Sequence, residues 1–222
     1  MPPRLTRAER KQQTRAELLA AAQRVFLRDG FHGASLAGIA EEAGYTFGAV
    51  YSNFQNKDDL FLAVLDAENR RRVPLHVDLL LDAPSLEEGL RASAREYAQY
   101  AQEHPDWTAV YVEFWTHASR RPELRRQVAA RHEQLIDTVA ELVEEFARRW
   151  GVEFTIPARE VVRGTYALSR GMGLERLVDP EATPLAQFEE MFMAYVTGTI
   201  RQRAGNGAPQ PPSTRRSKGG LP

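Results

Sequence analysis

The 222-residue sequence predicts an all-α protein of about nine helices, and three observations support this prediction. Apolar residues recur with the spacing of a helix through most of the chain. No stretch longer than a few residues alternates between apolar and polar side chains as a half-buried strand does. Capping residues, glycines and prolines divide the helical runs. Because 43% of the residues are hydrophobic, the helices can enclose a sizeable core.

The first predicted helix is amphipathic and ends just before Gly30. Glycine suits that position because it adopts the left-handed conformation of a helix C-cap without steric cost. The buried face is expected to consist of Leu18, Ala22, Val25 and Phe26.

Residues 35–54 form a predicted helix-turn-helix. Ser35 is a good N-cap, because its hydroxyl can accept a hydrogen bond from an unpaired amide of the first turn. Gly44 stands where the first short helix stops, and Thr46 can cap the second. Such a pair can place its second helix in the major groove of DNA. The apolar positions shared with the core are Leu36, Ile39, Ala40, Ala43, Val50 and Phe54.

This segment resembles the DNA-binding domain of tetracycline-repressor (TetR) family regulators, both over Gly30–Ala40 and over Gly44–Leu60. Phe47 departs from the family, which often has a polar or basic residue there. An aromatic ring can touch a thymine methyl group or a sugar, but it cannot hydrogen-bond a base edge. The resemblance implies a sequence-specific DNA-binding transcriptional regulator, not an enzyme, with double-stranded DNA as its partner and no cofactor.

The resemblance also implies which residues meet the DNA. Gly48 lets the helix backbone approach the groove, and the Tyr51 hydroxyl suits a phosphate oxygen. Lys57, at the start of the fourth helix, is expected to bind phosphate. The alternative for Thr46 and Tyr51 is a purely capping or packing role. The expected DNA-binding set is Ser35, Thr46, Phe47, Gly48, Tyr51, Ser52, Lys57 and Arg10.

Basic charge gathers at the N-terminal end. Residues 1–57 contain eight Lys or Arg and five Asp or Glu, whereas the formal charge of the whole chain is −1. The pI near 6.5 therefore requires DNA binding to come from a local patch. The basic residues before the first helix are expected to form an arm that reaches the minor groove, or alternatively a frayed, solvated end. They are Arg4, Arg7, Arg10 and Lys11.

Composition and motifs argue against other classes of protein. The chain has no cysteine, which excludes disulfides and thiolate metal sites, and its five histidines lack the spacing of metal ligands. His132-Glu133 begins a zinc-protease pattern, but Ile136 stands where the second histidine belongs. We expect no metal site, no membrane span and no secretory signal, and thus a cytoplasmic protein.

The chain is expected to divide into a DNA-binding domain (1–66), an effector-binding and dimerisation domain (67–204) and a disordered tail (205–222). Pro74 and the turn at 82–84 are expected to break the chain after the fourth helix. Further helices are predicted from Ser85 to His104, Trp107 to Ser119, Pro122 to Trp150, Pro157 to Leu177 and Pro184 to Ala204.

The last two helices are apolar on more than one face, which indicates a second contact surface. The resemblance implies that they form a four-helix homodimer interface, and glycines spaced by seven residues would let a partner helix come close. Packing within the chain, against the long helix, is the alternative. The expected interface residues are Gly164, Leu168, Gly171, Phe188, Phe192 and Tyr195.

The resemblance further implies a ligand cavity among the middle helices and a repressor that leaves a palindromic operator when a small, largely apolar effector binds. A transcriptional activator, an architectural DNA-binding protein without an effector, and an all-α binding or enzymatic domain are the alternatives. Aromatic residues at helical spacing are also common in plain cores. The candidate effector-binding residues are Tyr97, Trp107, Tyr111, Phe114, Trp115, His117, Tyr166 and Arg170, with Glu113 as a further polar contact.

Overall fold

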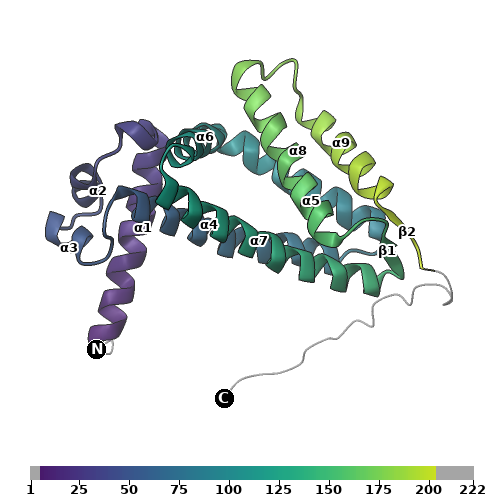
Figure 1. The fold of residues 1–222 in the computed structure, drawn as a ribbon, viewed down its shortest axis with the longest axis horizontal. Helices are drawn as coiled ribbons and strands as arrows, with labels where there is room; N and C mark the ends of the chain where they lie inside the picture. The colour runs from purple at the N-terminus through teal and green to yellow at the C-terminus, as the bar shows by residue number, and fades with distance from the viewer. Residues whose placement is uncertain (1–5, 204–222) are drawn as a thin grey trace.

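A computed structural model describes residues 6–203 of the chain. This range contains nine α-helices and two short strands, arranged as an elongated molecule in which α1–α3 lie at one end and α8 and α9 at the other (Figure 1). The elements are α1 (Arg7–Gly33), α2 (Leu36–Glu42), α3 (Phe47–Tyr51), α4 (Lys57–Leu81), α5 (Leu86–Glu103), α6 (Pro105–Ser119), α7 (Pro122–Arg149), β1 (Val152–Phe154), α8 (Ala158–Val178), α9 (Leu185–Gly198) and β2 (Ile200–Gln202).

The N-terminal core is rich in aromatic residues and includes side chains from the distant helix α6. Phe26, Phe31 and Phe61 are fully buried, and the ring of Phe61 lies edge-on to that of Phe26 with centroids 4.9 Å apart. Phe114 of α6 enters the same cluster, with its ring centroid 4.4 Å from that of Phe61. The three-helix unit therefore does not close its core alone.

Gly30 ends the regular part of α1, as predicted, and its φ of 73° is the left-handed conformation that favours glycine. The following turn is held by α6, because the backbone N–H of His32 donates to Glu113 Oε2 at 3.2 Å. A Cβ added to Gly30 would lie 3.0 Å from the carboxylate of Glu113. Glycine is needed here for its conformation and for the close approach of α6.

Two predictions about the N-terminal half are wrong, the break of the fourth helix at Pro74 and the N-terminal arm. Pro74 lies inside α4, which continues to Leu81, because packing against α5 and α7 outweighs the loss of one backbone donor. Arg7, Arg10 and Lys11 belong to α1 and do not form an arm. Thr6 starts this helix with a capping box: Thr6 Oγ1 accepts from the Glu9 N–H, while the Glu9 carboxylate accepts from the Thr6 N–H.

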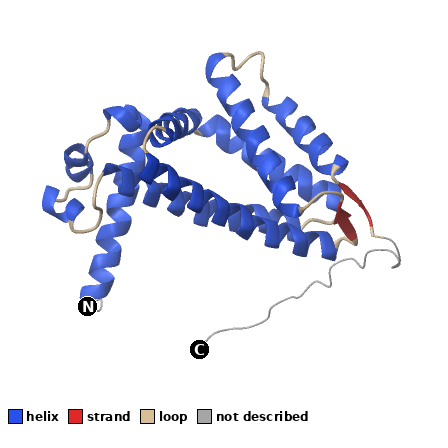
Figure 2. Cartoon of the chain, viewed as in Figure 1, coloured by secondary structure: helices blue, strands red, loops and turns tan. Residues whose placement is uncertain are grey.

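The C-terminal end of the described chain also differs from the expectation. The last helix ends at Gly198 and not near 204, and β2 then pairs antiparallel with β1 (Figure 2). Gly151, with φ 64°, turns the chain out of α7 into β1. Strands of three residues are too short to produce an alternating pattern, so the sequence did not reveal them. Arg4 and the predicted tail at 205–222 lie outside the described residues.

A second core joins α5, α7, α8 and α9 at the far end of the molecule. The long helices α4 and α7 run along the molecule and connect this end to the N-terminal unit (Figure 1). Within residues 6–203 we find no helix with both the length and the hydropathy that a membrane span requires. The buried residues of the second core include Leu90, Ala94, Phe146, Met172, Phe188 and Phe192.

Candidate nucleic-acid interface and ligand cavity

Helix α3 presents an exposed aromatic pair. Phe47 is 49% exposed and Tyr51 is 51% exposed, and their rings meet edge to face with centroids 4.7 Å apart. Gly48 lies between them in the sequence, and a Cβ added there would meet no atom closer than Thr46 Oγ1, at 3.9 Å. Side chains this large and apolar are seldom left in water without a function, so this face is suited to a groove or a sugar-phosphate backbone.

The hydroxyl groups around the motif are arranged as caps. Ser35 Oγ accepts from the Gly38 N–H at 3.0 Å, and Thr46 Oγ1 accepts from the Ala49 N–H at 3.3 Å. Each of these two hydroxyls keeps its own hydrogen for donation, as a phosphate contact requires. Ser52 differs, because its Oγ already donates to the Ala49 carbonyl at 2.8 Å. Ser52 can therefore offer DNA mainly an acceptor.

Lys57 has a structural role that the sequence did not indicate. Its ammonium donates to the carbonyl oxygens of Ala34 at 2.9 Å and His32 at 3.3 Å, and it lies 4.8 Å from the ring centroid of Phe31. Partial burial lowers the pKa of Lys57, and the nearby carboxylates of Asp58 and Glu113 offset this only in part. The side chain ties the start of α4 to the end of α1. Its phosphate contact stays a prediction.

Replacing Lys57 with methionine should therefore lower the free energy of unfolding by about 1–2 kcal/mol, because two carbonyl groups lose their donor. Urea denaturation at neutral pH measures this loss. Lys11→Met is the matched control, since Lys11 is exposed on α1, and it should change stability by less than about 0.5 kcal/mol. If Lys57 also contacts phosphate, its removal should flatten the salt dependence of DNA binding by about one unit of slope.

Arg15 is a further residue of this region that the sequence analysis missed. Its Nη1 donates to the Asn53 carbonyl at 2.9 Å, and its guanidinium carbon lies 4.3 Å from the ring centroid of Phe54. It thus fixes the segment after α3 to α1. The sequence pattern that could have indicated it is the interval of four residues from Arg7 to Lys11 and from Lys11 to Arg15, which places the three cations on one face of α1. Arg10 is also exposed on α1.

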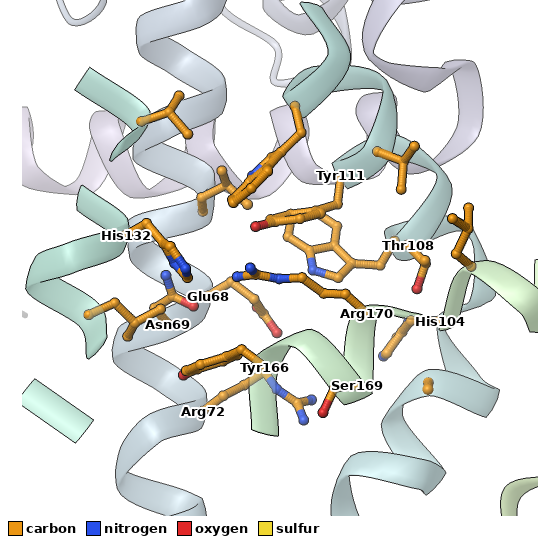
Figure 3. A pocket seen from close by; sticks show the side chains of 18 of the residues that line it. Glu68, Asn69, Arg72, His104, Thr108, Tyr111, His132, Tyr166, Ser169 and Arg170 are labelled. Carbon is orange, nitrogen blue, oxygen red and sulfur yellow. The ribbon is translucent and has the colours of Figure 1, made fainter. Parts of the chain in front are cut away.

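The body contains a cavity of about 410 Å³ between α4, α5, α6, α7 and α8. Helix α6 contributes one face, through residues at helical spacing such as Thr108, Tyr111 and Trp115. Figure 3 shows side chains from several helices converging on this space. Six of the eight candidate effector-binding residues line it: Tyr97, Trp107, Tyr111, Trp115, Tyr166 and Arg170.

Phe114 and His117 were predicted incorrectly, and so was Glu113. They lie on another face of α6, because they stand one or two positions from Trp115, which lines the cavity, and each step along a helix turns the side chain by roughly 100°. Phe114 is fully buried in the N-terminal core. His117 Nε2 contacts Asp58 Oδ1 at 3.0 Å, and the Glu113 carboxylate accepts from the end of α1.

Arg170 dominates the polar part of the cavity. Its guanidinium carbon lies 4.9 Å from the ring centroid of Tyr111, 4.8 Å from that of Trp115 and 5.3 Å from that of Tyr166. Burial raises the pKa of the Tyr166 hydroxyl to about 12, so this group stays protonated at neutral pH. His132 also lines the cavity, and burial together with Arg170 and Arg163 lowers its pKa to about 4.

Helix α4 supplies Glu68, Asn69 and Arg72 to the cavity wall, a contribution that was not predicted from the sequence. Arg72 is 12% exposed and donates to Glu96 at 3.1 Å, and its guanidinium carbon lies 3.5 Å from the ring centroid of Tyr100. The four-residue spacing of Glu68 and Arg72 was a usable signal.

A second, smaller cavity of about 210 Å³ adjoins the first and is lined mainly by apolar side chains of α5, α7, α8 and α9. The two cavities share part of their walls. The residues common to both are Asn69, Arg72, Tyr97, Tyr166 and Ser169.

Two family models match the sequence, one over the small N-terminal helical unit and the other over the larger body. Residues 18–64 match the bacterial regulatory proteins of the tetR family, and residues 86–201 match the C-terminal domain of BetI-type transcriptional repressors. The second match alone covers more than half of the chain. The protein belongs to the TetR family. It is therefore a transcriptional regulator with a helix-turn-helix DNA-binding domain, and not an enzyme.

Individual TetR-family relatives are similar in sequence to this protein over most of its length. The nicotine-responsive transcriptional repressor HdnoR of Paenarthrobacter nicotinovorans is 32% identical over 186 residues, which is 80% of this chain and 88% of the relative. The transcriptional repressor AcnR of Corynebacterium jeikeium is 29% identical over 198 residues, covering 89% and 85% of the two chains. A TetR-family regulator from Mesorhizobium loti has the same fold, with a TM-score of 0.65 and 21% identity over 87% of this chain and 96% of its own.

Five of the six residues expected at the TetR dimer interface lie in contacts within the chain. Phe188 and Phe192 are 3% and 9% exposed in the second core. Gly164 is covered by Tyr195, whose hydroxyl donates to the carbonyl of Glu160 at 3.2 Å. The wide apolar arc of α9 is thus largely explained by its packing on α5 and α8. These side chains pack within the chain, but those of α9 pack mainly on α5 and α8 and not on the long helix α7, as the alternative had it; Leu168 also packs against this core.

Other residues of α8 and α9 are exposed on the outward face, and two of them, Gly171 and Leu174, also border the 410 Å³ cavity. Gly171 is exposed, and a Cβ added there would meet nothing within 4 Å. Val178 is 86% exposed, Leu174 is 47% exposed and Met191 is 40% exposed. This apolar face has room for another helix at Gly171 and large side chains to bury beside it.

The stability of this TetR protein should depend on pH through His76. Burial and, after it, the nearby Arg72 lower the pKa of His76 to about 4, although His76 Nε2 lies 2.8 Å from Glu96. Between about pH 6.5 and 4 the unfolded chain binds a proton that the folded chain does not. Stability is therefore full above this range and falls as the pH is lowered through it.

We expect His76 to cost the folded state about 1–2 kcal/mol at pH 5 relative to pH 7. Urea denaturation of the wild type and of His76→Gln at the two pH values measures this cost as the difference between their pH dependences. His104→Gln is the control, because His104 is exposed at the start of α6. Equal pH dependences of the wild type and His76→Gln would contradict the prediction.

Proposed function

We propose that the protein is a homodimeric transcriptional repressor that leaves a palindromic operator when a small, largely apolar molecule occupies the 410 Å³ cavity. The observation that carries this proposal is the double role of α6. Thr108, Tyr111 and Trp115 line the cavity, whereas residues on the other face, such as Phe114, belong to the core of the DNA-binding domain.

This arrangement couples the two sites mechanically. A ligand that moves α6 must also move the end of α1, because the Glu113 carboxylate holds the His32 N–H and approaches Gly30 closely. His117 makes a second link, to Asp58 at the start of α4. Close-packed contacts of this kind transmit a displacement and do not absorb it. A difference of about 1–3 kcal/mol in ligand affinity between two conformers is enough for a useful switch.

Dimerisation is supported by the outward face of α8 and α9, which contains Gly171, Leu174, Val178 and Met191. A two-fold axis through this face would place two α3 helices side by side, as palindromic half-sites require. We expect Met191→Glu to shift the protein from dimer to monomer in sedimentation equilibrium. Gln134→Glu, at an exposed position on α7, adds the same charge and should leave the dimer intact.

Repression and small-molecule release are supported by the relatives. HdnoR and AcnR are both named as repressors, and HdnoR is named as nicotine-responsive. These names apply to those proteins. They favour, for this chain, a regulator that blocks transcription by occupancy and responds to a small molecule.

Selection of bound duplexes from a random library tests the proposal. We expect an inverted repeat with half-site centres separated by about one turn of DNA. A reporter promoter that overlaps this repeat should be repressed when the protein is expressed, and a panel of small apolar compounds should contain members that release the duplex in a shift assay. Increased reporter expression would indicate an activator. Binding without sequence preference would indicate an architectural protein.

A further inference from the structure

The 410 Å³ cavity contains an aromatic box that the chain fills with its own cation. The guanidinium carbon of Arg170 lies within 5.3 Å of three ring centroids, those of Tyr111, Trp115 and Tyr166. Figure 3 shows the Arg170 side chain extended across the cavity between Tyr111 and Tyr166. A cation held in this way is stabilised by the ring faces without being neutralised.

The charges around this box are not balanced. Two carboxylates line the cavity, and each has an arginine partner: Glu68 pairs with Arg71 at 2.6 Å, and Asp66 pairs with Arg131 at 3.4 Å. Among residues 6–203, no carboxylate lies within ion-pair distance of Arg170. The cavity therefore contains one arginine whose positive charge has no counter-charge in the part of the chain that the structure describes.

Arg72 adds an unsatisfied hydrogen-bond donor to the same wall. Its Nη2 donates to Glu96 at 3.1 Å, but its Nη1 is buried without a hydrogen-bond partner in the described structure. A buried guanidinium donor that lacks a partner costs free energy until an acceptor reaches it. Within the described residues Arg170 lacks a counter-charge and Arg72 Nη1 lacks an acceptor, so a ligand that brings a negatively charged acceptor group suits both.

We propose that the effector is an aromatic carboxylate whose carboxylate group pairs with Arg170 and whose apolar body lies against Trp107, Tyr111 and Trp115. This inference rests on the proposed function, because it names the chemical class of the molecule that the cavity takes. The guanidinium fork matches the two oxygens of a carboxylate. The walls offer flat apolar surface for the remainder of the molecule.

A cationic effector fits this cavity less well. The place between the rings that would hold an organic ammonium group is occupied by Arg170, and a second cation there would meet a fixed positive charge in a poorly solvated site. The tyrosine hydroxyls also favour an anion. Burial raises the pKa of Tyr111 above its usual range and that of Tyr166 to about 12, so both stay protonated and can donate to an acceptor.

The test uses two probes with the same aromatic body and opposite charge, naphthalene-2-acetate and (2-naphthylmethyl)trimethylammonium. Binding to the full chain at neutral pH is measured by calorimetry and by the fluorescence of Trp107 and Trp115, which line the cavity. We expect the carboxylate to bind the wild type at least about tenfold more tightly than the ammonium probe, since one charge-assisted contact supplies that difference.

Two variants test whether Arg170 is the source of the preference for the carboxylate probe over the ammonium probe. Arg170→Gln should abolish it, leaving the two affinities within about threefold of each other, a difference of less than 1 kcal/mol. Arg163→Gln should retain it, because Arg163 lies on the same helix but pairs with Glu133 at 3.0 Å and does not line the cavity. Circular dichroism and the melting temperature verify the fold of both variants. The comparison of the two probes on the wild type does not depend on either variant.

Three results would overturn the proposal: ammonium binding as tight as carboxylate binding, no carboxylate binding to the wild type, or an unchanged preference in Arg170→Gln. Release of DNA is measured separately. A carboxylate that binds through Arg170 but does not release DNA would count against the proposed function and uphold the anion site. Release by the ammonium probe would uphold the function and overturn the anion site.

Discussion

Replacing Phe114 with alanine is expected to lower the free energy of unfolding by about 3–5 kcal/mol, the range for large-to-small changes of a buried phenylalanine. The side chain is fully buried. Its ring centroid lies 5.1 Å from that of Phe31 and 4.4 Å from that of Phe61, so its removal leaves a cavity at the junction of α1, α4 and α6. Urea denaturation followed by circular dichroism measures the loss.

Phe47→Ala is the matched control, because it removes the same ring from a site that is 49% exposed. We expect it to lower stability by less than about 1 kcal/mol, since little buried area is lost. The comparison tests more than one side chain. If Phe114→Ala were no more costly than Phe47→Ala, the shared core between α6 and the DNA-binding domain would be wrong, and the mechanical coupling proposed for the effector would lose its basis.

Replacing Tyr51 with alanine should weaken binding to the selected operator by about 10- to 100-fold, the effect of removing a well-placed contact worth roughly 1.4–3 kcal/mol. Stability should hardly change, because the ring is 51% exposed and its aromatic contact is with Phe47, itself exposed. Shift assays at fixed salt measure the affinity, and thermal melting measures the stability.

Tyr51→Phe separates the two possible contributions of this side chain. If the hydroxyl donates to a phosphate, Tyr51→Phe should lose about three- to tenfold in affinity, as for a single hydrogen bond. If the ring contacts the groove instead, Tyr51→Phe should bind like the wild type while Tyr51→Ala remains weak. Unchanged operator affinity in both variants would contradict the placement of α3 on DNA.

The helix-turn-helix was predictable because the interactions that define its helix ends are local in the sequence. The N-caps Ser35 and Thr46 bond amides three residues away, and Gly44 adopts its positive φ where the first helix ends. Each of these interactions spans a few residues, so it leaves a pattern in the linear sequence. The aromatic and apolar residues of the second core were also recognisable, although their partners were not.

The cavity and its charge could be predicted only in part. Tyr97, Tyr111, Trp115 and Tyr166 were identified as apolar walls, and the structure places them around one space. The position of Arg170 among three rings depends on how α8 crosses α6, and helical spacing carries no information on that crossing.

The sequence was enough to identify the chain as a helical, DNA-binding regulator. Capping residues, glycines at helix ends and helical periodicity are patterns that extend over only a few residues. Contacts between distant segments required the folded chain: Lys57 on the carbonyls of α1, the face of α6 that buries Phe114, and the pairing of Val152 with Gln202. The physical reason is that a side chain's neighbours across helices are set by how whole elements pack. A residue's type and local spacing restrict those neighbours but do not specify them.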